Sequence, residues 1–241
     1  MSTLTPESPA EQRESFADDL AGMGNFFIDP AGAAKRVFSK WFWLGPLVLF
    51  SAVSIIASYV MMPIAQHVMQ TMPIPANADP ERFQKGLEMG MMFQRIAMWF
   101  APVTTAILLS IQALIIFAMC SVTSVSVKFR WLFNLVAGCS LIQLLASIAS
   151  VVILKAKGDV STIAELRPAL GLDIFMPEGT NRFLTAFVGY FSIFEIWWIV
   201  MIVMIFSAAF RVSKGKAFAI VLPLIVLNIL FRVGAAVFQR T

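Results

Sequence analysis

Charged residues are scarce in this chain, and their scarcity excludes most soluble protein classes. Only 13% of the 241 residues are Asp, Glu, Lys or Arg, whereas 59% are hydrophobic. Because a soluble domain usually carries about 25% charged residues, the composition predicts an integral membrane protein. The formal net charge is only +4, and no basic stripe with interleaved aromatic residues is present, so we expect no nucleic-acid partner.

Residues that bind metals or carry out catalysis are also few. The chain has two cysteines, Cys120 and Cys139, and a single histidine, His67, which are too few for a Cys/His zinc cluster. Both cysteines lie in apolar sequence, where a free thiol behaves as a small hydrophobic group. The phosphate-binding loop GxxxxGK(S/T) and the motifs GxSxG and HExxH are missing. We therefore expect a protein that is not an enzyme and that binds no cofactor or metal.

Long apolar runs are what this chain has in abundance. Five of them cover residues 41–64, 96–122, 133–154, 184–210 and 217–238. A helix of about 20 residues crosses the hydrocarbon core of a bilayer, and it pairs each backbone N–H and C=O internally. The runs therefore predict an all-α, polytopic membrane protein, with five transmembrane helices in the lipid bilayer and short interfacial helices between them.

Prolines mark where several of these helices begin and end. Asp29-Pro30 and Asp79-Pro80 each combine an N-cap residue with a proline in the first turn, which predicts a helix start at both places. We expect the first span to end near Pro63, because proline removes a helical hydrogen bond. Pro102 is expected to divide the second span from the segment before it.

Two polar joints predict helices that lie at the membrane surface. In residues 80–101, Phe83, Leu87 and Met91 fall on one face of a helix that lies partly in the interface. In the joint 155–183, the pattern Thr162-Ile-Ala-Glu165 fits a capping box. It predicts a short amphipathic helix over residues 162–172.

Five spans place the two termini on opposite sides of the membrane. The short joints at 123–132 and 211–216 are rich in Lys and Arg, and short basic loops are typical of the cytoplasmic side. The amino terminus is therefore predicted inside and the carboxyl terminus outside. Residues 1–27 are predicted to be a polar, partly disordered tail, and residues 28–241 the membrane domain. Within the tail, the spacing of Phe16, Leu20 and Met23 fits either a short amphipathic helix or an unstructured apolar segment.

Glu195 is the single acidic residue within the five apolar runs. A charged group at the centre of a transmembrane helix costs about 2.5–3.5 kcal/mol, so it is usually paired, protonated or directed at a polar cavity. Arg232, in the last span, falls at a similar depth on this topology, and we predict that the two side chains face each other. The alternative is that Glu195 is protonated and Arg232 extends outward to the lipid head groups.

Three amides complete a candidate polar cluster inside the membrane. Gln112 and Gln143 lie near the middle of their spans, and Asn228 lies in the last span. Each can hydrogen-bond across helices or line a path for a substrate. With Glu195 and Arg232 they form the candidate site.

A short stretch of the fourth and fifth spans is similar to a known family. Phe194-Glu195-Ile196-Trp197, followed by an apolar half-span and the basic joint 211–217 (RVSKGKA), resembles the signature region of the bacterial branch of the Yip (Ypt/Rab-interacting protein) domain family. The segment that starts at Ile28-Asp29-Pro30 is similar to the family's opening. The resemblance covers residues 27–238, but only the stretch 194–217 is specific.

This resemblance implies a five-span protein of the bacterial inner membrane with a cytoplasmic amino terminus. It implies a non-enzymatic accessory or scaffold for other membrane proteins, such as the subunits of an ABC-type exporter. Glu195 and Trp197 match family positions to which no role is assigned. The residues themselves leave a second hypothesis open, a small transporter or channel with a polar path through Glu195 and Arg232.

Overall fold

The computed structural model describes residues 16–71, 79–158, 160, 164–166, 168–177 and 179–236. These residues form α-helices and two short 3-10 turns, and they contain no β-strand. Five helices are long and apolar enough to cross a membrane: α4 (Leu44–Thr71), α6 (Ala101–Val122), α7 (Phe129–Lys157), α9 (Ile193–Phe210) and α10 (Lys214–Ala235). The predicted all-α, multi-pass class is confirmed.

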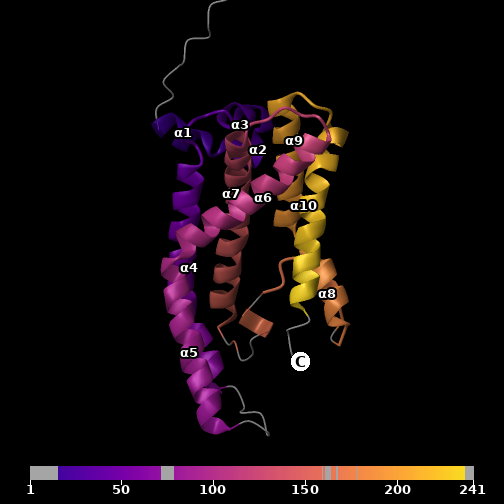
Figure 1. Ribbon diagram of the computed structural model, residues 1–241. Helices are drawn as coiled ribbons and strands as arrows, with labels where there is room; N and C mark the ends of the chain where they lie inside the picture. Colours follow the sequence, from indigo (N-terminus) through magenta and orange to yellow (C-terminus); the bar gives the residue numbers. More distant parts are fainter. Residues whose placement is uncertain are drawn as a thin grey trace, which may run out of the picture.

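The five long helices form a bundle around α7, which contacts α4, α6 and α9 (Figure 1). Its first half is the best-buried part of the molecule, and Leu135, Val136 and Ile142 there are fully buried. Three short helices, α1 (Phe16–Gly22), α2 (Asn25–Ile28) and α3 (Pro30–Arg36), cover one end of the bundle. Helix α10, the last described helix, ends at the opposite end of the bundle from α1.

The amino-terminal helices are part of the packed core. Phe26 of α2 is fully buried and stacks on Phe42, with 5.0 Å between ring centroids. The ring also lies directly against Gly138 of α7, where a Cβ atom would overlap it. Glycine at 138 therefore permits this close approach of α2 to α7. The folded region begins before residue 28, and the polar stretch 1–15 lies outside the described residues.

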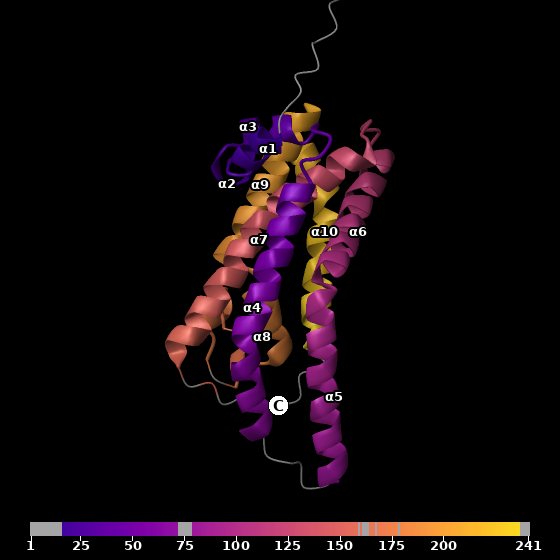
Figure 2. The same ribbon diagram turned by 90° about the vertical axis from the view of Figure 1, so that its left-hand side faces the viewer.

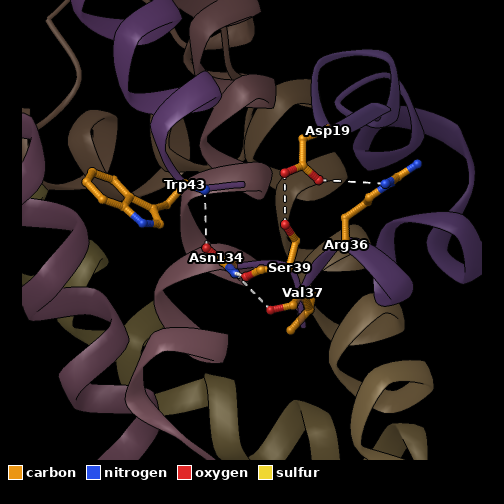
Figure 3. A network of polar contacts seen from close by, with 6 residues as sticks. All are labelled: Asp19, Arg36, Val37, Ser39, Trp43 and Asn134. Atoms are coloured by element: carbon orange, nitrogen blue, oxygen red, sulfur yellow. Dashed lines mark hydrogen bonds and ion pairs between the residues drawn. The ribbon is translucent and has the colours of Figure 1, made fainter. Parts of the chain in front are cut away.

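A buried side-chain amide on α7 hydrogen-bonds to the backbone of residues 37–43, which connect α3 to α4 (Figure 3). Asn134 is fully buried, and its side-chain amide donates to the C=O groups of Val37 and Ser39 at 2.9 and 2.7 Å. Its oxygen accepts from the backbone N–H of Trp43 at 3.2 Å. Nearby, Asp19 of α1 accepts a hydrogen bond of 2.8 Å from the Ser39 hydroxyl.

The predicted helix starts are confirmed. The Asp29 side chain accepts from the N–H groups of Ala31 and Gly32, and α3 has its proline in the first turn. Asp79 accepts from the N–H of Glu81 at 3.0 Å and caps α5 (Pro80–Trp99). A separate helix, α6, begins at Ala101 with Pro102 in its first turn, as predicted.

The prediction that the first span ends near Pro63 is wrong. Helix α4 continues to Thr71 with Pro63 inside it, so His67 lies on a helix rather than on a loop. The end of α4 packs against the end of α7, where Val68 is fully buried with Leu154 and Val160. That apolar burial offsets the single backbone hydrogen bond that Pro63 removes.

Helix α5 also differs in placement from the prediction. It runs beside the end of α4 as the second arm of a hairpin, rather than flat across the end of the bundle (Figure 2). Both views show this α4–α5 hairpin projecting beyond the other helices. In the segment 162–172, residue 162 lies outside the described residues. The parts that are described form the 3-10 turns η1 (Ala164–Leu166) and η2 (Leu172–Phe175) instead of an amphipathic α-helix.

Candidate functional site

The predicted fourth span, residues 184–210, is divided into two helices. Helix α8 (Arg182–Tyr190) ends just before Phe191, and α9 begins at Ile193. At the break, the N–H of Ser192 donates to the C=O of Tyr190 at 2.8 Å, and the Ser192 hydroxyl accepts from the N–H of Glu195 at 3.1 Å. The prediction of a continuous helix here is therefore wrong. Glu195 lies in the first turn of α9, not in the middle of a span.

Two glycines let the chain pack tightly around this break. A Cβ atom on Gly171 would overlap the C=O of Gly189, and an antiparallel bridge joins Gly171 to Ser192. A Cβ atom on Gly189 would lie 2.8 Å from Oδ2 of Asp173 and 3.2 Å from Nη2 of Arg232. The absence of side chains at both positions lets η2 and the end of α10 meet α8, which places Asp173 beside Arg232.

A cavity of about 410 Å³ lies next to the break. One part of its wall is polar and is contributed by α7, α9 and α10, while the other part is apolar. The polar lining residues are Gln143, Ser147, Ser150, Ser192, Glu195 and Arg232, and the others are Met61, Ala146, Val151, Leu154, Leu166, Pro168, Leu170 and Gly189. The cavity therefore offers two charged side chains and several apolar ones to the same occupant.

Glu195 and Arg232 share this cavity without a direct ion pair between them. The Arg232 guanidinium attracts the Glu195 carboxyl electrostatically, and Gln143 lines the same cavity near that carboxyl. Glu195 is half-buried and Arg232 is exposed on the surface of the chain. The two side chains thus line one cavity; that they face each other as a pair stays a prediction.

The other two predicted amides lie apart from this wall. Asn228 of α10 faces the Tyr190 hydroxyl, which is buried and makes no hydrogen bond of standard geometry within the described part of the chain. Gln112 is half-buried on α6 and does not line the cavity. The structure therefore brings Gln143, Glu195 and Arg232 to one cavity. Asn228 lies beside Tyr190 instead, and Gln112 lies on α6 outside the cavity.

Trp197 has a clear structural part. Its indole Nε1–H donates to the C=O of Phe27 at 2.9 Å, and its ring packs on Phe27 with 6.0 Å between centroids. The bond joins residues 170 positions apart in the chain. Trp197 therefore holds α2 against α9, at the opposite face from the cavity residue Glu195 two positions earlier.

Several residues of the site were not predicted from the sequence. Ser192, Asp173 and the glycine pair shape the break, and one signal for it was present: Ser192 and Glu195 have the Ser-x-x-Glu spacing of a capping box.

In the described ranges, no group of three or more His, Cys, Asp or Glu side chains is placed to hold a metal ion. Cys120 and Cys139 are both free and buried.

Comparison of the chain with protein-family models, with curated proteins and with solved structures finds no match.

Proposed function

We propose that this chain is a non-enzymatic accessory or scaffold protein that binds other membrane proteins, such as the subunits of an ABC-type exporter. The observation that carries the proposal is the α4–α5 hairpin. It projects beyond the other helices (Figures 1 and 2), and its outward side is apolar and exposed at Met89, Met92, Phe93, Ile96 and Trp99. Contiguous apolar patches of this kind mark protein–protein or membrane interaction sites.

The same apolar surface continues along α6. A shallow groove of about 560 Å³ runs beside that helix and is almost entirely apolar; it is lined by Pro102, Val103, Ala106, Ile107, Ser110, Ile111, Leu114 and Phe129. On α5, Gly86 and Gly90 lie one turn apart, and a Cβ atom added at either glycine would meet no other atom within 4 Å. This Gly-x-x-x-Gly spacing permits close approach of a second helix.

The remaining parts of the proposal come from the sequence. We place the protein in the bacterial inner membrane, with the end that carries α1–α3 in the cytoplasm. Basic residues concentrated in the joints at 123–132 and 211–216 support this orientation. The resemblance of residues 194–217 to the Yip domain family supports a role without catalysis.

Site-specific photo-crosslinking in intact membranes tests the accessory function. A photoreactive residue at Phe93, on the exposed side of α5, should give a discrete adduct with another membrane protein. The matched control is Leu230, which is 61% exposed on α10 and should crosslink to lipid. Lipid adducts alone at both positions would refute the proposal.

The cavity at the helix break favours a second candidate, a small transporter or channel. Discontinuous helices with polar groups at the break are typical of transporter binding sites, and Glu195 and Arg232 line such a cavity here. The purified chain reconstituted in liposomes would then carry a solute or ion flux that Glu195→Gln abolishes. The absence of flux with a panel of ions and small solutes would count against it.

A further inference from the structure

Glu195 and Arg232 bring opposite charges to one cavity without neutralising each other by direct contact. Charges in membrane-spanning segments are costly unless they are paired. A single occupant that carries both charges would satisfy both side chains at once. We infer that the cavity binds a zwitterionic group, with an ammonium toward Glu195 and a phosphate or carboxylate toward Arg232.

The negative side of the cavity is suited to an ammonium. The Glu195 carboxylate has about four lone-pair sites, and the amide of the neighbouring Gln143 has two donors, which is fewer than that capacity. The hydroxyls of Ser147 and Ser150 donate to the C=O groups of Gln143 and Ala146 at 3.1 and 2.9 Å, so their lone pairs remain as acceptors. An ammonium has three donors to share among these oxygens.

The positive side of the cavity is suited to an oxyanion. Arg232 presents five N–H donors in a planar fork, which matches phosphate and carboxylate geometry. Asp173 and Arg232 both lie against Gly189, and Asp173 accepts from the Gly171 N–H at 3.1 Å. Because Asp173 does not line the cavity, it leaves the cavity side of the guanidinium to a ligand.

The apolar part of the cavity lining also restricts which occupant fits. Met61, Val151 and Leu154 line the cavity, and Arg232 is in the last turn of α10, near the end of the bundle where lipid head groups would lie. A volume of about 410 Å³ lies within the usual range for small-ligand sites, about 300–1,000 Å³. It fits a head group or a small free zwitterion. The inference does not depend on the exposed apolar face of α5, on which the accessory function rests.

Binding measurements on the purified full-length chain in maltoside detergent test this inference. Three probes separate the contributions: phosphatidylethanolamine, which has both charges; phosphatidylglycerol, which lacks the ammonium; and soluble phosphoethanolamine. The wild type should retain phosphatidylethanolamine about 10-fold more tightly than phosphatidylglycerol, the size expected from one charged hydrogen bond. Native mass spectrometry reports the retained lipid.

Two variants distinguish the two sides of the cavity. Glu195→Gln should erase the preference for phosphatidylethanolamine, whereas Arg232→Gln should weaken both lipids about 10-fold. Glu88→Gln and Arg95→Gln are matched controls, because both residues are exposed on α5 away from the cavity. They should change neither affinity nor preference.

The outcomes also identify the source of the ligand. Binding of soluble phosphoethanolamine that depends on Glu195 supports a free zwitterion, and binding of the lipid alone supports a head group. A wild type that binds both lipids equally and ignores phosphoethanolamine overturns the inference, even if a variant fails to fold. An intact lipid preference in Glu195→Gln also overturns it. Neither result alters the crosslinking expected at Phe93, so the two proposals fail separately.

Discussion

Replacing Asn134 by leucine should separate the amino-terminal helices from the bundle. Leucine is similar in shape to asparagine but has no polar side-chain atoms, so it occupies the site without pairing the groups around it. Three backbone groups lose their partner: the C=O of Val37, the C=O of Ser39 and the N–H of Trp43. The site is fully buried, so water cannot replace the amide without rearrangement.

The size of the effect follows from these three bonds. Each is worth about 1 kcal/mol net, and a buried group left without a partner costs about 1–3 kcal/mol. Asn134→Leu should therefore lower the free energy of unfolding by about 3–5 kcal/mol. Asn134→Asp keeps the bond from Trp43 but sets an anion against two carbonyl oxygens, so its loss should be at least as large.

Denaturant unfolding in detergent, combined with hydrogen exchange, measures this change and locates it. The amides of α2 and α3 should lose protection in Asn134→Leu before those of α9. Ser140→Ala is the matched control on the same helix. Its hydroxyl is also buried but donates within α7, to the C=O of Ala137 at 2.7 Å, so the loss should stay within about 1 kcal/mol. Equal losses in the two variants would refute this account of Asn134.

Three smaller predictions follow from the packing and the helix break. Gly138→Ala should lower stability by about 1–3 kcal/mol through overpacking, and because its methyl group would overlap Phe26, a Phe26→Ala background should reduce that loss in a double-mutant cycle. Trp197→Phe removes the bond to the Phe27 C=O and should cost about 1 kcal/mol, with faster hydrogen exchange in α2. Ser192→Ala removes the hydroxyl that accepts from the N–H of Glu195 and should cost about 1 kcal/mol; an unchanged free energy of unfolding would show that the hydroxyl does not stabilise α9.

The sequence was most informative where a physical rule acts locally. Apolar length identified all five long helices, and an acidic cap followed by proline located the starts of α3 and α5 to the residue. Glu195 and Arg232 line one cavity, but the depth argument placed Glu195 toward the middle of a span, and the break puts it in the first turn of α9.

Features that depend on tertiary contacts were missed. Pro63 predicted a helix end, yet burial of Val68 with Leu154 of α7 favours continuation of the helix. The apolar run 184–210 concealed the break at Ser192, because hydropathy is insensitive to a change of helix axis. Gln112 was placed in the polar cluster from depth alone, and depth does not specify the direction in which α6 presents it.

The interruption at Ser192 makes α9 the shortest of the five long helices. Helix α9 has 18 residues, about 27 Å at 1.5 Å per residue, and its residues Ile196 and Val200 are exposed on the outer surface. Helix α4 has 28 residues, about 42 Å on the same scale. Its last turns carry Gln66, His67 and Gln70, so the polar end of α4 extends beyond the apolar part of the helix. Beside α9, the exposed Leu184 and Phe187 of α8 continue the apolar surface past the break. The fourth apolar run is therefore divided between two helix axes, whereas α4 keeps a single helix through its apolar part and its polar end.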